Sequence, residues 1–285
     1  MKPAPFDYVC PATIAEAVAL LAAHGGEAQA IAGGQSLMPL LAFRLAAPKL
    51  LVDLRKLSGL DRIVIGEDGV RLGARVRWRD IEHDPRLRSA HPLLPAAVAH
   101  IAHYQIRNRG TVGGSLAHAD PAAELPGIAV TCDAAIAVVG ANGGREIAAA
   151  DFFLGPLTTA LMPDEIITEI RLPAWPMQRR WGFEEFAWRR GDFALAGIAA
   201  YYDEAEDKRA VAAHIGVIGA CTRPHRLAAA EAALNGRIVD DSAIADAARA
   251  AAAEVDPPYD LHASAAYRCA LVETLVQRAL TRASQ

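Results

Sequence analysis

Two glycine pairs are the residues of this sequence best suited to bind an anion. One pair lies in the segment AGGQS (32–36) and the other in TVGGS (111–115), and a serine closes each segment. A glycine pair lets backbone N–H groups approach an anion closely, because no Cβ stands in the way. The serine hydroxyl adds a further donor. Each segment is therefore suited to a phosphate oxygen, and the two together are suited to a diphosphate.

Neither segment matches the common nucleotide-binding motifs. The first lacks the GK[ST] ending of a Walker A loop, and its spacing is not GxGxxG, which disfavours a Rossmann dinucleotide site. Taken singly, each segment is equally consistent with an ordinary turn between a strand and a helix. The two in this order are more specific than either alone.

The elements around the glycine pairs predict an α+β protein. Before and after the first pair we expect a helix over 13–26 with a Thr13–Glu16 capping box, a strand over 28–32, a helical segment over 37–45 and a strand over 50–54. Around the second pair we expect a hairpin over 63–74, helices over 78–83, 91–104 and 121–132, a hairpin over 135–149 and a strand over 165–172.

The C-terminal third has a different pattern. The segment PAWPMQRRW (173–181) has two prolines and three basic residues, and we interpret it as a boundary. Beyond it, strands are expected at 183–186, 194–202 and 211–219, and helices at 226–234, 241–253 and 264–282. The predicted division is 1–57, 58–175 and 176–285, the last part being a three-stranded antiparallel sheet with three helices.

Composition narrows the class of protein. The 285 residues carry a net charge of −4, which gives no basic footprint for nucleic acid. No segment has the length of apolar residues needed to cross a membrane, and the N-terminus lacks the apolar core of a signal peptide, so a cytoplasmic location is expected. The four cysteines, Cys10, Cys132, Cys221 and Cys269, lie too far apart in sequence for a CxxC metal site or an iron–sulfur cluster.

In their wider context the two segments resemble a known family. AGGQSLMPLLAFRLA and RNRGTVGGSLAHADPAAELP are similar to the two flavin signatures of the medium, FAD-binding subunit of molybdenum hydroxylases. This group includes aerobic carbon monoxide dehydrogenase and relatives of xanthine dehydrogenase. The resemblance covers nearly the whole chain and extends to FEEFAWRRGDFALAGIAA (183–200), which resembles the opening of the family's C-terminal domain. It implies a PCMH-type fold, with FAD between two N-terminal subdomains and the C-terminal domain closing over the flavin ring.

The resemblance also implies which residues contact FAD. Ala32, Gly33, Gly34, Gln35, Ser36 and Leu37 would wrap the diphosphate and ribityl chain, and Thr111, Gly113, Gly114 and Ser115 would hold the other side. Ile101 and Ala102 match a stretch near the adenine, and Ile166 and Ile167 match an aliphatic pair against the isoalloxazine, although all four are equally consistent with core packing. Asp192 and Phe193 are candidates from the closing domain, and Phe193 is equally consistent with a strand core.

Three polar residues have two interpretations each. Glu124 matches an acid near the polar parts of the flavin, and it is also consistent with a helix-start charge. His118 and Asp120 could form a catalytic pair, but fixing their loop by hydrogen bonds, with some flavin contact, is the better interpretation. The side chain of Gln35 could contact the flavin or brace its loop.

The implied role is electron transfer. A large subunit would oxidise substrate at a molybdopterin cofactor, a small subunit would carry two [2Fe–2S] clusters, and this FAD would pass electrons to an external acceptor. The assembly implied is a dimer of heterotrimers. No catalytic residue is assigned to this chain, because the flavin supplies the redox chemistry. The sequence departs from relatives at Ala187, where a lysine is common.

Two other functions remain open on sequence alone. A self-sufficient flavin oxidase or dehydrogenase would act directly on a small organic substrate, but it would usually be longer and carry a cap domain with its own base. An assembly domain that has lost its flavin is disfavoured by the intact glycine–serine residues of both segments.

Overall fold

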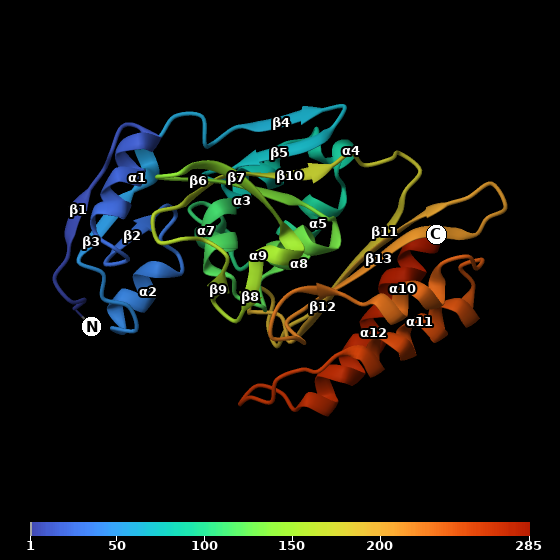
Figure 1. The fold of residues 1–285 in the computed structure, drawn as a ribbon. Helices are drawn as coiled ribbons and strands as arrows, with labels where there is room; N and C mark the ends of the chain where they lie inside the picture. The colour runs from blue at the N-terminus through green and yellow to red at the C-terminus, as the bar shows by residue number, and fades with distance from the viewer. Residues whose placement is uncertain (1) are drawn as a thin grey trace.

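The computed structural model describes residues 2–285 and contains three main sheets that follow one another along the chain. Figure 1 shows the N-terminal part in blue at one end, a larger green part in the middle, and the orange and red C-terminal part packed against it. Each sheet falls within one of the three ranges predicted from sequence. The boundaries at 57 and 175 themselves stay a prediction. The α+β class is confirmed by these separate sheets.

The first part is a small parallel sheet in the order β1-β3-β2. Its elements are β1 (Asp7–Val9), α1 (Ile14–Ala23), β2 (Ala28–Ile31), α2 (Leu37–Ala42), β3 (Leu50–Asp53) and the 3₁₀ turn η1 (Leu54–Lys56). The predicted capping box is present, since the Thr13 side chain accepts from the Glu16 N–H and the Glu16 side chain from the Thr13 N–H. Strand β1 was not expected. All three of its side chains are exposed, so it has no alternating apolar pattern.

The middle part is built on an antiparallel sheet in the order β4-β5-β10-β6-β7. Its strands are β4 (Ile63–Gly66), β5 (Gly69–Gly73), β6 (Ala135–Gly140), β7 (Gly143–Ala148) and β10 (Ile166–Pro173), with a separate pair, β8 (Phe153–Gly155) and β9 (Thr158–Thr159). Both predicted hairpins are therefore present. The helices are α3 (Trp78–His83), α4 (Leu87–Ala90), α5 (Leu93–Val98), α6 (Tyr104–Arg107), α7 (Val112–His118), α8 (Glu124–Thr131) and α9 (Ala149–Phe152).

The predicted helix over 91–104 is wrong in extent. Helix α5 covers only Leu93–Val98, and the chain turns at Ala102, whose φ is +42°. Arg107 fixes this turn, because its Nη1 donates to the carbonyls of Ile101 and Ala102 at 2.9 and 3.0 Å. The pattern of apolar residues does not predict such a turn, because the residues before and within the turn are mostly apolar. The turn lets Ile101 and Ala102 face a cavity instead of continuing a helix.

The C-terminal part has four strands, not the predicted three. Its order is β11-β12-β13-β14, and all neighbours are antiparallel. The strands are β11 (Arg180–Phe186), β12 (Ala196–Glu204), β13 (Ala210–Ile218) and β14 (His225–Arg226), and the helices are α10 (Ala228–Leu234), α11 (Asp241–Glu254) and α12 (Ala265–Ser284). Strand β14 is two residues long, so it has no length over which a strand pattern could show.

The middle and C-terminal parts share a core. Phe183, Ala199, Tyr201 and Ile218 are buried in the same hydrophobic cluster as the sheet residues of the middle part. Gly127 on α8 allows a close approach, since a Cβ there would lie 2.3 Å from the Ile218 side chain. This contact fixes the C-terminal sheet against α8, and with it the β11–β12 connection that reaches the cavity described next.

Candidate functional site

The first glycine pair forms an open loop between β2 and α2. Gly34 has φ +74°, a left-handed conformation that glycine adopts without strain. Within residues 2–285, no acceptor receives a hydrogen bond from the backbone N–H groups of 33–36. Ser36 precedes α2, and its hydroxyl makes no capping hydrogen bond. Consecutive free amides beside a left-handed residue form a concave anion site.

Gln35 braces this loop from within. Its Nε2 donates to the carbonyl of Gly33 at 3.1 Å. Gln35 thus braces the loop, and it also lines the cavity, so its contact with the flavin stays a prediction.

The second glycine pair is not a turn, as the sequence suggested, but the first turn of α7. Thr111 is the N-cap, and its Oγ1 accepts from the Gly114 N–H at 3.2 Å. The N–H groups of Val112 and Gly113 donate to Val76 and Ala74 carbonyls at 2.9 and 2.8 Å. Threonine favours strands and glycine favours turns, so the sequence predicted a turn here. The helix is stabilised instead by tertiary contacts with residues 74–76. The amides of this segment are therefore occupied, unlike those of 33–36.

The two segments lie directly against each other. A Cβ on Gly33 would be 2.2 Å from the Arg109 carbonyl oxygen, a contact that no side chain could occupy. Gly33 is therefore required by the close approach of the two segments, in addition to any ligand. Gly113 is required by packing, because a Cβ there would be 2.6 Å from that of Ala74.

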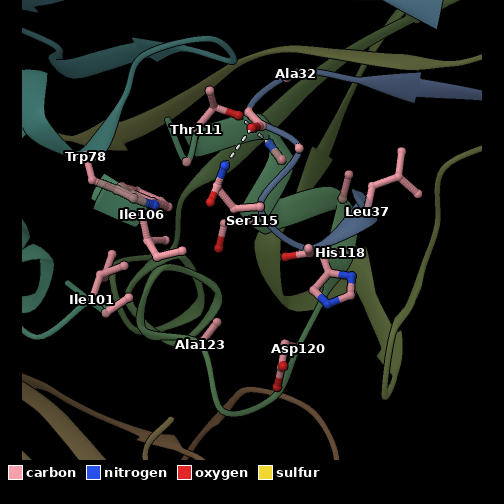
Figure 2. Close-up of a pocket in the computed structure, with 18 of the residues that line it drawn as sticks. Ala32, Leu37, Trp78, Ile101, Ile106, Thr111, Ser115, His118, Asp120 and Ala123 are labelled. Carbon is pink, nitrogen blue, oxygen red and sulfur yellow. Dashed lines mark hydrogen bonds between the residues drawn. The ribbon is translucent and has the colours of Figure 1, made fainter. Parts of the chain in front are cut away.

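The loop 33–36 opens onto a cavity of about 580 Å³ between the first two parts of the molecule and the C-terminal part. Figure 2 shows Trp78, Ile101 and Ile106 on one side of this space and Leu37 and His118 on the other, with Ser115 between them. The predicted site residues that line it are Ala32, Gly33, Gly34, Gln35, Ser36, Leu37, Ile101, Ala102, Thr111, Gly114, Ser115, His118, Asp120, Glu124, Asp192 and Phe193.

The remaining predicted residues line a second, adjoining cavity of about 320 Å³. These are Gly113, Ile166 and Ile167, and Gly114 and Ala32 border both spaces. Ile166 and Ile167 therefore line a different cavity from Phe193.

Sequence reasoning missed several wall residues. Trp78, His103, Ile106, Leu157 and Gly191 also line the larger cavity. Their positions in sequence carry no binding signature. Only the turn at Ala102, which brings 101–106 to the cavity as a strap, could have pointed to His103 and Ile106.

The β11–β12 connection reaches the same cavity from the C-terminal part. Gly191 has φ +88°, and a Cβ there would lie 2.8 Å from the Ala102 carbonyl oxygen, so the connection touches the strap. Phe193 is 66% exposed, which excludes the strand-core interpretation. No lysine lines the cavity within the described chain, in line with the departure at Ala187.

Glu124 is the one buried charged residue of the cavity wall. It is the first residue of α8 and 6% exposed. Burial, followed by the negative charge of Glu185, raises its pKa to about 8. The carboxyl is thus neutral and able to donate a hydrogen bond at neutral pH.

His118 and Asp120 do not form a catalytic pair. Among residues 2–285 no hydrogen bond joins them, and Asp120 instead accepts from the Ala122 N–H at 2.9 Å, which fixes the loop before α8. Residues 2–285 also contain no group of His, Cys, Asp or Glu placed to bind a metal ion. None of the helices described has the length and apolar character of a membrane span.

Comparison with known proteins decides the family. A family model described as the FAD binding domain in molybdopterin dehydrogenase matches residues 4–175, and one described as the CO dehydrogenase flavoprotein C-terminal domain matches 181–283. The chain belongs to the flavoprotein subunits of the molybdopterin dehydrogenases. FAD is therefore its cofactor, as the resemblance implied.

Individual relatives of this flavoprotein cover its whole length. The nicotine 6-hydroxylase medium subunit of Paenarthrobacter nicotinovorans is 40% identical over 99% of this chain and 99% of its own. The 6-hydroxypseudooxynicotine dehydrogenase complex subunit alpha of the same organism is 39% identical over 99% of this chain and 96% of its own. The structure of carbon monoxide dehydrogenase from Hydrogenophaga pseudoflava matches with a TM-score of 0.96 at 36% identity, covering 99% of this chain and 98% of that one.

The residues present fit FAD. The free amides of 33–36 provide donors for a diphosphate, and the two adjoining cavities, which share Ala32 and Gly114, provide space for two ring systems. The flavoprotein is thus an oxidoreductase subunit of the molybdenum hydroxylase type, of which the relatives are medium subunits of multi-subunit complexes.

Proposed function

We propose that the backbone amides of 33–36 hold the FAD diphosphate. The supporting observation is that these amides have no acceptor within the described chain, whereas those of 112–114 do. Thr111 then acts on the site by holding α7 in place, and the hydroxyls of Ser36 and Ser115, which line the larger cavity, supply side-chain donors.

We also propose that the isoalloxazine occupies the larger cavity and the adenine the smaller one. The larger cavity has polar wall residues, His118, Asp120 and Glu124, that suit the nitrogen and oxygen atoms along one edge of a flavin. The smaller is lined largely by aliphatic side chains, including Ile166 and Ile167. This assignment reverses the sequence-based expectation for Ile101–Ala102 and Ile166–Ile167.

In this arrangement the protein binds and orients FAD and shields it from solvent, and bound FAD supplies reversible transfer of electrons. Trp78, Ile101 and Ile106 form an apolar wall that excludes water. Phe193 lines the same cavity from the C-terminal part. Glu124 places a neutral, hydrogen-bonding acid at the polar edge. The close approach of Gly191 to Ala102 supports a closing role for Asp192 and Phe193.

We further propose that the chain relays electrons within a complex. Substrate is oxidised at the molybdopterin cofactor of a large subunit, electrons pass through two [2Fe–2S] clusters of a small subunit, and FAD here delivers them to an external acceptor. The support is that relatives matched over 96% and 99% of their length are named as an alpha and a medium subunit. A dimer of heterotrimers and a cytoplasmic location are parts of the same proposal.

Two measurements test this function. The purified chain should be yellow, or should become yellow on adding FAD, and should bind one FAD per chain. A colourless chain that takes up no FAD contradicts the proposal. Co-expression with its partners should yield a complex that contains molybdopterin and iron–sulfur clusters. Turnover of an organic substrate by the isolated chain would favour the self-sufficient oxidase instead.

A further inference from the structure

The tip of the β8–β9 hairpin holds a leucine in a backbone conformation that leucine avoids. Pro156 and Leu157 are the two residues between these strands, and Leu157 has φ +53°. In a two-residue turn that begins with proline, a positive φ at the second residue is ordinarily found with glycine or asparagine. A leucine in this conformation brings its Cβ close to a backbone carbonyl, which costs stability. The geometry of the turn therefore does not explain why this residue is leucine.

Leu157 also differs from the other residues that have a positive φ. Within residues 2–285, the remaining non-glycine residues in this conformation are three alanines and three charged residues: Ala102, Ala119, Ala212, Arg44, Asp133 and Lys208. Leu157 thus carries the one large apolar side chain held in this way in the described chain. Backbone strain of this kind concentrates at ligand sites, where the surrounding structure holds the residue in place.

The tip is fixed by contacts that do not involve the Leu157 side chain. The backbone N–H of Leu157 donates to the carbonyl of Ala119 at 3.0 Å, which ties the tip to the end of α7 (Figure 1). At the base of the hairpin, Phe152 and Phe153 are buried in the core of the middle part, with ring centroids 5.1 Å apart. The backbone at the tip is thus anchored on two sides, and the leucine side chain is left over.

The larger cavity accounts for the leucine, whereas packing within the protein does not. Leu157 is 56% exposed and belongs to none of the hydrophobic clusters of the described chain. It lines the larger cavity together with His118 and Asp120, the two neighbours of Ala119. Phe193, which is 66% exposed, lines the same cavity. Exposed apolar surface on a cavity wall is stabilised when a ligand covers it and removes it from water.

We propose that Leu157 is a cofactor-contact residue that packs against the isoalloxazine of bound FAD. The inference rests on the proposed function, which places this ring system in the larger cavity. The anchored turn holds the leucine at the cavity wall before FAD arrives, so binding orders little additional chain. The energetic cost of the strained turn is then offset by an apolar contact that forms only in the FAD-loaded protein.

Leu157→Asn separates contact with FAD from a role in the fold. Asparagine is close to leucine in size and tolerates a positive φ, so the FAD-free chain should unfold about 2 °C higher than wild type. The dissociation constant for FAD should rise about tenfold, because a polar group replaces an apolar contact. The visible absorbance band of the flavin should also lose the fine structure that apolar surroundings give. A lower unfolding temperature of the FAD-free variant would assign Leu157 to the fold and overturn the proposal.

Two further variants serve as controls. Leu154 lies on the same hairpin and is also 56% exposed, but it lines neither cavity, so Leu154→Asn should leave the dissociation constant and the flavin spectrum unchanged. Leu157→Met keeps a large apolar side chain at the tip and should bind FAD within about twofold of wild type. If Leu157→Asn binds FAD as tightly as Leu154→Asn does, the proposal is overturned.

A variant on another wall of the cavity distinguishes this inference from the proposed function. Ile106→Ala, beside Trp78 and Ile101, should also change the flavin spectrum if the isoalloxazine lies in the larger cavity. A spectral change in Ile106→Ala but not in Leu157→Asn would overturn the contact with Leu157 alone. An unchanged spectrum in both variants would contradict the placement of the ring system, and a wild-type chain that binds no FAD would contradict the proposed function.

Discussion

The segments 33–36 and 111–115 are alike in sequence, yet their backbone amides are used differently. In the first, four consecutive N–H groups have no acceptor in the described chain. In the second, Thr111 and the carbonyls of Val76 and Ala74 accept those of 112–114. The first segment is thus organised to bind a ligand and the second to position a helix. The same dipeptide serves both, because glycine allows close approach of any group, be it a phosphate or another backbone.

The largest effect is expected from Gly33→Val. The new side chain would meet the Arg109 carbonyl oxygen at 2.2 Å, so the two segments must separate. We expect complete loss of bound FAD and a free energy of unfolding lower by ~3 kcal/mol. Flavin absorbance and thermal unfolding measure the two effects. Gly155→Ala is the control, since a Cβ there meets nothing within 4 Å and φ is not positive; full flavin occupancy in Gly33→Val would contradict the contact.

A paired comparison of Gly114→Val and Gly113→Ala separates binding from packing. Gly114 borders both cavities, so valine there should abolish FAD retention. It should also cost ~1 kcal/mol, because its Cβ would lie 2.8 Å from the Thr111 Oγ1 that caps the helix. Gly113→Ala should cost ~2 kcal/mol through its clash with Ala74 while the folded protein still binds FAD. Equal flavin loss in both variants would mean that the two glycines have one role.

Thr111→Ala tests whether the second segment acts by holding α7. Loss of the N-cap should lower the free energy of unfolding by ~1 kcal/mol, as judged by the chemical denaturation midpoint. Thr111→Ser retains the capping oxygen and should remain near wild type. If the alanine variant unfolds like wild type but loses FAD, Thr111 contacts the cofactor and the contrast between the segments is weaker than we infer.

The smallest effect is expected from Ser36→Ala. Its hydroxyl makes no capping hydrogen bond, so stability should not change. Loss of one neutral hydrogen bond to the diphosphate should weaken FAD binding about fivefold, measured by fluorescence titration of the flavin. An unchanged Kd would leave the amides alone as the binding groups of the first segment.

Most elements around the site were predictable, for local reasons. The α1 capping box, the two hairpins and helix α3 follow from cap residues, turn dipeptides and apolar spacing, all of which act over a few residues. The failures occurred where distant parts of the chain decide. The turn at Ala102 depends on the hydrogen bond from Arg107 and on the cavity that the turn faces. Strand β14 depends on pairing with the edge of β13, and α7 depends on hydrogen bonds to carbonyl groups at 74–76.

The sequence by itself determined the family and the residues from which the site is drawn, because glycine pairs, caps and the family's motifs are local patterns of residue types. Only the tertiary structure decided which glycine pair leaves its amides free and which aliphatic pair faces which cavity. Those outcomes depend on which hydrogen-bond donors and acceptors pair and on which charged groups are removed from water. Both are decided when folding buries together residues that are far apart in the chain.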